Sequence, residues 1–236
     1  MSFVVTGHRG AMGVEPENTL RSFRRAAVDG ADEIELDLRV SADGHLVICH
    51  DATVERTTDG QGAIAELTLA ELQALDAGGG ERIPTFAEVL DHVDLPIQAE
   101  LKAADAVAHL AALLAESADL RARVTVAGFH DERVAEVVRT APGGVGALIV
   151  REVTDGLIER VRSIGATRVF CGWAGLDAEF VDRAHAAGLL VTGWPAPTEV
   201  EVARALDLGL DGLTTDVPAM ARAAVDTHRP EAATSR

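Results

Sequence analysis

The sequence EIELDLRVSADGHLVICH, which spans residues 33–50, contains two strand-like segments separated by a short polar stretch. In its first half apolar side chains alternate with charged ones, as in a strand that presents different chemistry on its two faces. The pair Asp43-Gly44 lies between the two segments and is favoured in the two-residue type I′ turns of β-hairpins. Such a turn sets Asp37 opposite His50. We therefore expect a hairpin in which these two side chains share one face.

Outward from this hairpin, short apolar segments alternate with helical patterns along the chain. Strand-like segments are Phe3 to His8, Glu33 to Leu38, Ile97 to Leu101, Val124 to Phe129, Gly146 to Val150, Arg168 to Cys171, Leu189 to Trp194 and Gly212 to Thr215. Helix-like apolar spacing occurs in segments such as Ala104 to Glu116, Asp131 to Thr140, Asp177 to Ala187 and Glu199 to Leu208. Repeated strand-then-helix order predicts an α/β fold with a parallel sheet, and eight such units favour a closed TIM-type (β/α)₈ barrel. Active sites on that fold lie at the C-terminal ends of the strands.

The length of 236 residues is enough for one full-sized domain with a buried core. We expect a single (β/α)₈ domain over residues 1–226. The stretch from about residue 51 to residue 84 is rich in Thr, Asp and Gly and interrupts the alternation, which predicts a small insertion near the barrel mouth. We expect residues 227–236 to form a disordered tail.

The charge balance limits the classes of partner. The chain has 38 acidic and 21 basic side chains and a formal net charge of -17, so its surface repels polyanions such as nucleic acid. No apolar run approaches the roughly 20 residues that cross a bilayer, so no stable membrane insertion is expected. Cys49 and Cys171 lie in separate strand-like segments, which favours buried thiols in a reducing compartment. Because no export signal is visible either, we expect a cytoplasmic location.

Acidic side chains recur at strand spacing. Glu35 and Asp37 are two positions apart and therefore point to the same face of their strand. Glu100 and Lys102 repeat this spacing on the next parallel strand, which adds a third carboxylate and one cation. Burying unpaired carboxylates together is costly, so a hard divalent cation is the partner that fits best. Three carboxylates suit Mg²⁺ or Ca²⁺, with Mn²⁺ as a further candidate, better than a structural zinc ion.

Simpler interpretations of these residues are open at this point. The first acidic pair equally suits an exposed edge strand or ion pairs with Arg9 or Arg39, and Glu100 with Lys102 suits a surface ion pair. Lys102 is, however, the single lysine of the chain. This favours a position that needs a compact ammonium rather than a generic positive charge.

Two histidines end predicted strands. His8-Arg9-Gly10 closes the first strand of the barrel, and His50-Asp51 closes the hairpin. Because imidazole titrates near neutrality, His8 and His50 beside a carboxylate-held metal form a general acid and base pair suited to phosphoryl transfer. Arg9 offers a planar fork for phosphate oxygens. The remaining histidines have no such context and are interpreted as structural or solvated: His45, His92, His109, His130, His185 and His228.

Taken in order, these motifs resemble those of the glycerophosphodiester phosphodiesterase family, over nearly the whole chain. They are His8-Arg9-Gly10, Pro16-Glu17-Asn18-Thr19, Glu35-Leu36-Asp37, His50-Asp51, Arg56-Thr57-Thr58-Asp59-Gly60, Ile83-Pro84-Thr85, Glu100-Leu101-Lys102 and Asp211-Gly212-Leu213-Thr214-Thr215-Asp216. The resemblance implies metal-dependent hydrolysis of a glycerophosphodiester, such as glycerophosphocholine or glycerophosphoethanolamine, to glycerol phosphate and an alcohol. The roles that it implies are metal binding by Glu35, Asp37 and Glu100, acid and base catalysis by His8 and His50, phosphate binding by Arg9 and Lys102, and pocket lining by Trp194.

Two segments at the rim depart from the family pattern. The family usually has Ser-Phe at Gly128-Phe129, and Trp-Thr-Val-Asn at Trp194-Pro195-Ala196-Pro197. Both departures leave the alcohol specificity open. Glu17 and Asn18 suit either a contact with the site or the start of the first helix, where Asn is a common N-cap.

Other functions suit parts of the pattern. A phospholipase D-like action on lysophospholipids needs an apolar tunnel at the rim, and a non-catalytic phosphodiester-binding module needs no histidine pair. A glycosidase that uses Glu35 with Glu100 leaves Lys102, Arg9 and both histidines without roles.

Overall fold

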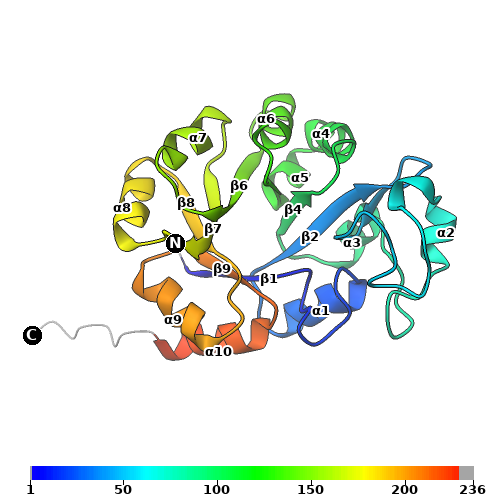
Figure 1. Cartoon of the computed structure of the whole chain (residues 1–236), viewed down its shortest axis with the longest axis horizontal. Helices are drawn as coiled ribbons and strands as arrows, with labels where there is room; N and C mark the ends of the chain where they lie inside the picture. Colours follow the sequence, from blue (N-terminus) through cyan, green and yellow to red (C-terminus); the bar gives the residue numbers. More distant parts are fainter. Residues whose placement is uncertain (1, 229–236) are drawn as a thin grey trace, which may run out of the picture.

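The structure, a computed structural model, describes residues 2–228. Its parallel strands are β1 (Val4–Gly7), β2 (Glu33–Val40), β4 (Ile97–Leu101), β5 (Val124–Gly128), β6 (Val145–Glu152), β7 (Arg168–Ala174), β8 (Leu190–Gly193) and β9 (Gly212–Thr215). They are hydrogen-bonded in the order β1-β9-β8-β7-β6-β5-β4-β2, and the pairing of β1 with β2 closes the ring. The TIM-type barrel expected from the strand-helix alternation is therefore confirmed (Figure 1).

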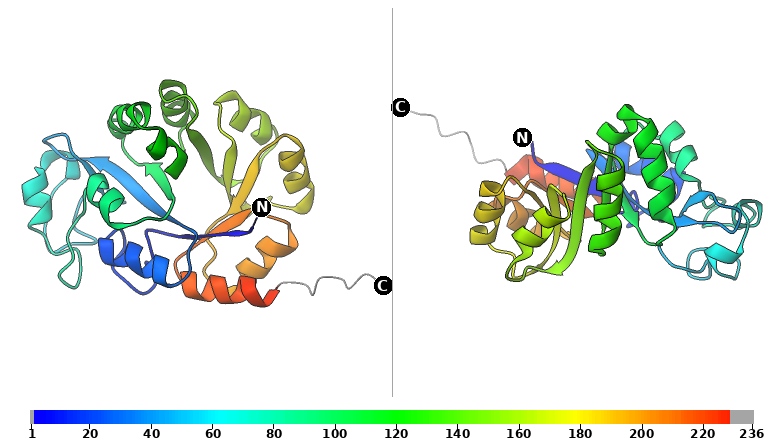
Figure 2. Two further views of the ribbon diagram at one scale, coloured as in Figure 1. Left: turned by 180° about the vertical axis from the view of Figure 1, so that it is seen from behind. Right: turned by 90° about the horizontal axis from the view of Figure 1, so that it is seen from above.

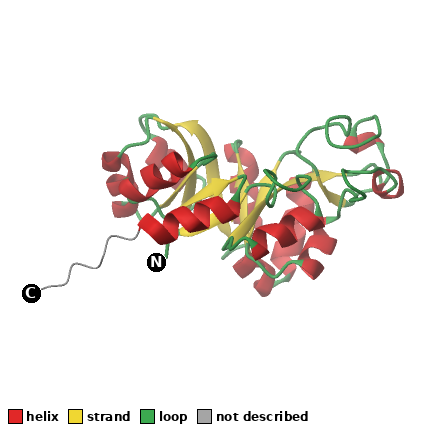
Figure 3. Cartoon of the chain, turned by 90° about the horizontal axis from the view of Figure 1, so that it is seen from below, coloured by secondary structure: helices red, strands yellow, loops and turns green. Residues whose placement is uncertain are grey.

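Helices surround the barrel, as Figures 2 and 3 show. They are α1 (Leu20–Val28), α2 (Leu69–Gln73), α3 (Phe86–His92), α4 (Ala106–Glu116), α5 (Ala118–Arg123), α6 (Asp131–Thr140), α7 (Leu157–Ser163), α8 (Ala178–Ala186), α9 (Glu199–Asp207) and α10 (Pro218–His228), with a 3₁₀ turn η1 (Ile64–Glu66). Polar caps fix several of their starts, and Thr85 and Thr198 form capping boxes with Glu88 and Glu201. No helix within the described residues is long and apolar enough to cross a membrane.

The barrel interior is polar on one side and apolar on the other. Glu33, Glu35 and Asp37 of β2 and Gln98 and Glu100 of β4 are all buried. The alternate residues of both strands belong instead to a large apolar cluster with the helices. The opposite side of the interior carries a separate apolar cluster of Ala127, Ala147, Ile149 and Phe170, from β5, β6 and β7. A ligand at the mouth of the barrel therefore meets charge on one wall and apolar surface on the other.

The hairpin exists, but its expected register is wrong. The short strand β3 (Leu46–Ile48) pairs antiparallel with β2, and Leu38 lies opposite Ile48. The backbone N–H of Ser41 donates to the carbonyl of His45, at 3.0 Å, so the loop has three residues rather than two. As a result Cys49, not His50, lies next to Asp37 in the ladder, and its N–H donates to the Asp37 carbonyl at 3.0 Å.

The reason for the different register lies in Asp43. A type I′ turn needs a positive φ at both central residues, but within the described residues only Gly44 of this pair has one, at 85°. The Asp43 carboxylate instead accepts hydrogen bonds from the Ser41 hydroxyl, at 2.7 Å, and from the Leu69 N–H at the start of α2, at 2.9 Å. The turn is thus anchored to the insertion, and its loop consists of the three residues 42–44.

Residues 51–84 form the expected excursion beside the barrel mouth, at the right of Figure 1. The excursion contains η1 and α2 and encloses a small apolar cluster of its own, which includes Cys49, Val54 and Leu72. It returns to the barrel where the N–H of Ile48 donates to the carbonyl of Pro84, at 3.0 Å. At the other end of the chain, the expected tail begins inside α10, which continues to His228, and residues 229–236 lie outside the described part.

Candidate active site

A cavity of about 240 Å³ opens at the C-terminal ends of the strands. Its lining residues are His8, Arg9, Glu35, His50, Gln98, Glu100, Lys102, Phe129, Ile149, Arg151, Phe170, Trp194, Pro195 and Thr214. Seven of the eight site residues expected from the sequence therefore line this one cavity. The eighth, Asp37, lies behind the lining and is in contact with Lys102.

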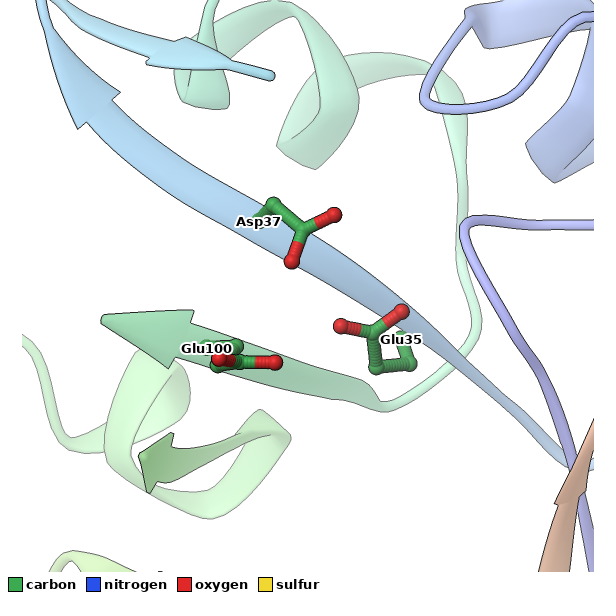
Figure 4. A group of neighbouring side chains, drawn as sticks. All are labelled: Glu35, Asp37 and Glu100. Carbon is green, nitrogen blue, oxygen red and sulfur yellow. The ribbon is translucent and has the colours of Figure 1, made fainter. Parts of the chain in front are cut away.

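Three carboxylates converge at one side of this cavity, two of them in its lining and Asp37 directly behind it. Glu35 and Asp37 project from β2, and Glu100 projects from β4, where it is the register partner of Asp37. Each offers an oxygen within 4.8 Å of the oxygens offered by the other two, and all three residues are buried. Figure 4 shows the side chains turned toward one shared space between the two strands. An acidic triad that could hold a metal ion thus lies where the sequence pattern predicts it.

Burial makes this triad unfavourable without a cation. Burial raises the pKa of Glu35 and of Glu100, and the negative charge of Asp37 raises both further. Glu35 Oε1 and Asp37 Oδ1 are buried and have no hydrogen-bond partner within the described residues. Oxygens of this kind are the ligands that hard divalent ions prefer, so the residues present fit a bound Mg²⁺, Ca²⁺ or Mn²⁺.

Lys102 is the nearest cation to the triad. Its Nζ lies 2.7 Å from Glu100 Oε1 and 3.4 Å from Asp37 Oδ1. Burial lowers the pKa of Lys102, but the charges of Asp37 and Glu100 more than compensate and raise the pKa above its ordinary value. The Arg9 guanidinium is a second cation, with Nε 3.3 Å from Asp37 Oδ2, so an excess of negative charge remains when all three carboxylates are ionised.

His8 is held by a carboxylate at the end of the last strand. Its Nδ1 lies 2.7 Å from Asp216 Oδ1, and its Nε2 points into the site, 4.0 Å from Glu35 Oε2. Burial lowers the pKa of His8, but the hydrogen bond with Asp216 and the charge of Glu35 together raise it above its ordinary value. Asp216 therefore fixes the orientation of the imidazole and leaves Nε2 available to a ligand.

His50 is held in a similar way by its neighbour in the chain. Its Nδ1 lies 2.6 Å from Asp51 Oδ1, and its ring lines the cavity. Burial lowers the pKa of His50, although the hydrogen bond with Asp51 acts in the opposite direction. His50 reaches the cavity despite the different hairpin register because β3 ends at Ile48 and the chain turns away from the strand there.

Arg9 connects the cavity to a wider ionic network. Its backbone N–H donates to Glu35 Oε2, at 2.9 Å, and its Nη1 donates to Glu17 Oε1, at 2.8 Å. Glu17 also accepts two hydrogen bonds from Arg56, at 2.7 and 2.8 Å. Arg56 in turn donates to Asp51, the partner of His50. The insertion is thus tied to Arg9 and to His50 through one guanidinium.

Asn18 contacts the site rather than capping a helix. The N-cap of α1 is Thr19, whose hydroxyl accepts from the Ser22 N–H. Asn18 is buried, and its backbone adopts the left-handed conformation, with φ 57°. Its Nδ2 donates a hydrogen bond to Asp37 Oδ2, at 2.8 Å. Of the two interpretations left open for this residue, the structure supports the site contact.

The apolar wall of the cavity comes from the other side of the barrel. Phe129 and Trp194 pack edge to face, with ring centroids 5.8 Å apart, and Trp194 Nε1 donates to the carbonyl of Phe170. Ile149 and Pro195 complete this wall. The two segments that depart from the family pattern therefore contribute to the apolar wall and not to the acidic one.

Sequence reasoning assigned no role to Asp216, Asp51 or Arg56. All three lie inside the motifs quoted above, so the signal was present. The sequence alone does not reveal which of these side chains contact each other. Asp216 and His8, for example, are separated by 208 positions and meet only when the barrel closes.

Fold and site together define a (β/α)₈ barrel enzyme with an acidic triad at its active-site end. The sequence profile of the glycerophosphoryl diester phosphodiesterase family matches residues 8–220. The chain therefore belongs to this family.

Individual relatives agree over nearly their whole length. A glycerophosphodiester phosphodiesterase from Caldanaerobacter subterraneus is 31% identical over 235 residues, which cover 92% of this chain and 96% of the relative. A solved structure of an Oleispira antarctica phosphodiesterase in complex with the product sn-glycerol-3-phosphate has a TM-score of 0.88 at 28% identity, and covers 94% of this chain and 96% of its own. A solved structure from Agrobacterium tumefaciens has a TM-score of 0.87 at 28% identity, and the match covers 97% of this chain and 99% of that one.

Proposed function

We propose that this enzyme hydrolyses glycerophosphodiesters to glycerol phosphate and an alcohol, with a divalent ion at the triad and with His8 and His50 as the acid and base pair. The observation that carries the proposal is the convergence of a buried acidic triad with two carboxylate-oriented imidazoles in a single cavity. Family membership and the product-bound relative support the same substrate class.

The metal ligands in this proposal are Glu35, Asp37 and Glu100. A bound Mg²⁺, Ca²⁺ or Mn²⁺ would supply positive charge that stabilises the negative oxygens of the reacting phosphodiester. Lys102 and Arg9 would bind the phosphate oxygens from beside the triad, as a compact ammonium and as a planar fork respectively.

The two imidazoles would move the protons. One proton must leave the attacking hydroxyl and another must reach the departing alcohol oxygen, so an acid and a base are both required. His8 and His50 each have Nδ1 engaged by a carboxylate, which leaves Nε2 for this transfer. We infer from the family resemblance that the glycerol hydroxyl of the substrate itself attacks phosphorus and expels the alcohol, and that water then opens the resulting cyclic phosphate to glycerol phosphate.

The size of the cavity favours deacylated substrates over lysophospholipids. At about 240 Å³ it is smaller than the roughly 300–1,000 Å³ of sites that hold drug-sized ligands. Trp194 and Phe129 line its apolar wall, with space suited to an alcohol headgroup or glycerol rather than to an acyl chain. The phospholipase D-like alternative therefore receives no specific support.

A substrate panel tests the proposal. Purified enzyme with Mg²⁺, Ca²⁺ or Mn²⁺ is offered glycerophosphocholine, glycerophosphoethanolamine and lysophosphatidylcholine, and glycerol phosphate and free alcohol are measured. We expect turnover of one or both deacylated diesters and much less turnover of the lysolipid. Turnover of the lysolipid alone would contradict the proposal.

We also propose a cytoplasmic location, since Cys49 and Cys171 are buried free thiols in the structure. Cell fractionation with a compartment marker tests it, and recovery in an exported fraction would contradict it.

A further inference from the structure

Arg151 is a cation of the cavity lining for which the proposed function has no role. It lies near the C-terminal end of β6, two positions beyond Ile149 and four beyond Ala147, both of which face the barrel interior. Its guanidinium lies over the ring of Phe129, 5.3 Å from the centroid. The side chain is thus directed into the mouth of the cavity and supported there by an aromatic face.

The backbone at Arg151 is held in place by a close contact with the next strand. The pairing of β6 with β7 is interrupted between Val150 and Glu152, where β7 contributes an extra residue. A Cβ at Gly172 of β7 would lie 2.1 Å from the Arg151 carbonyl oxygen, so only glycine fits there. Bulges of this kind re-aim side chains beside active sites. Arg151 is therefore carried by a strand that is paired with its neighbour on both sides of this position.

Arg151 also differs from the other cavity cations in its partners. Lys102, Arg9 and both histidines each have a carboxylate partner at 3.4 Å or less. Within residues 2–228, the Arg151 guanidinium has neither an ion pair with a carboxylate nor a hydrogen bond. In a chain of net charge -17, a guanidinium without a carboxylate partner in the substrate cavity is available to an anionic ligand.

Arg151 comes from a different strand than the residues assigned to the phosphate, although Lys102 Nζ lies 5.9 Å from the centroid of the same Phe129 ring. In the closed strand order, β6 stands four places from β1 in either direction, so Arg151 faces the His8-Arg9 segment across the barrel. The triad and Lys102 come from β2 and β4, on the polar wall. A diester whose phosphate lies on that wall would have one of its two arms directed toward the side of the barrel that carries Arg151.

We propose that Arg151 determines specificity for the leaving alcohol, by binding an anionic group on it, so that the preferred substrates are glycerophosphodiesters whose alcohol carries a carboxylate. This inference rests on the proposed function. Glycerophosphoserine and glycerophosphoethanolamine form a matched pair for its test, because they differ by one carboxylate on the alcohol.

The experiment measures kcat/KM for both substrates with the metal-loaded unmodified enzyme and with Arg151→Gln, Arg151→Lys and Arg162→Gln. We expect the unmodified enzyme to prefer glycerophosphoserine about tenfold, as a charge-assisted hydrogen bond of a guanidinium with a carboxylate would give. Arg151→Gln should lower kcat/KM for glycerophosphoserine to the level of glycerophosphoethanolamine and leave the latter nearly unchanged. Arg151→Lys should be intermediate, because it keeps the charge but loses the fork. Arg162→Gln, the loss of an exposed arginine on α7, should keep the preference.

Two results would contradict this inference about Arg151 without contradicting the proposed function. One is turnover of both substrates by the unmodified enzyme without preference. The other is an equal loss for both substrates in Arg151→Gln, which would assign Arg151 to the phosphate or the glycerol instead. Turnover of neither substrate, nor of any other glycerophosphodiester, would contradict the proposed function itself.

Discussion

Lys102 is the single lysine of the chain, and its ammonium lies between two buried carboxylates of the triad, Asp37 and Glu100. Its side chain is only 15% exposed, so the interpretation as a surface ion pair does not describe it. A guanidinium is broader than an ammonium and would not fit between the same two oxygens without displacing one of them.

We therefore predict that Lys102→Arg lowers kcat by about 10²-fold, because the broader guanidinium shifts the positive charge away from the position at which the compact ammonium acts on the transition state. The melting temperature should change little. Steady-state kinetics on a glycerophosphodiester, with thermal denaturation beside it, checks this. Kinetics close to those of the unmodified enzyme would contradict the phosphate-binding role.

Glu35→Gln separates metal binding from folding. Because Glu35 is a buried carboxylate crowded by Asp37, its neutralisation should not destabilise the metal-free protein, but it removes a charged ligand. We predict a large loss of divalent-metal affinity in titration calorimetry. Glu33→Gln is the matched control, because Glu33 lies two residues before Glu35 on the same face of β2, and this variant should keep the affinity for the divalent metal. Equal metal binding by both variants would count against the assignment.

Asp216 is predicted to act on catalysis through His8. Asn at this position keeps the size of the side chain but removes the charge that orients the imidazole and favours its protonated form. We expect Asp216→Asn to lower kcat by between about tenfold and 10²-fold, within the range of an impaired acid or base. Metal affinity should be retained. An unchanged kcat would show that His8 needs no such partner.

At the scale of elements, the insertion is tied to His50 through Arg56. This guanidinium binds Glu17, which holds Arg9, and Asp51, which holds His50. The hydrogen bonds with Glu17 and then with Asp51 raise the pKa of Arg56, so it remains charged.

We predict that Arg56→Lys lowers kcat at least about tenfold, because an ammonium lacks the planar fork that bridges the two carboxylates. Metal affinity should not change. Arg82→Gln is the control, since Arg82 belongs to the same insertion but pairs with Glu88 away from the cavity. If both variants lose activity equally, the effect comes from the stability of the insertion and not from positioning.

The hairpin shows which part of an element sequence reasoning can supply. The alternation in β2 and the Asp43-Gly44 pair predicted two antiparallel strands correctly. The expected register was wrong because the Asp43 carboxylate accepts a hydrogen bond from the N–H of Leu69, 26 positions away. The Asp43-Gly44 pair therefore does not form the two-residue turn that it favours in isolation. Local sequence defines the existence of the turn, but a long-range contact defines its length.

For the molecule as a whole, the barrel was predictable because each strand carries its own signal and the order of strands and helices permits few topologies. The candidate site was predictable as a set of positions, since residues at the ends of parallel strands meet at one mouth. The pairing within that set was not predictable from composition or spacing. The Asp216 to His8 contact and the ion pairs of Arg56 need the closed barrel and the folded insertion.

The measurement that tests the account most directly is turnover of glycerophosphoethanolamine after exhaustive chelation and after return of the metal. Two buried triad oxygens have no hydrogen-bond partner within the described residues, and three carboxylates share one small space. We predict that glycerol phosphate release stops when the divalent ion is removed and returns with Mg²⁺, Ca²⁺ or Mn²⁺, because the triad cannot bind an anionic phosphodiester while it is unneutralised. Glu35→Gln should not recover under the same conditions. Full turnover by the metal-free enzyme would contradict the central claim.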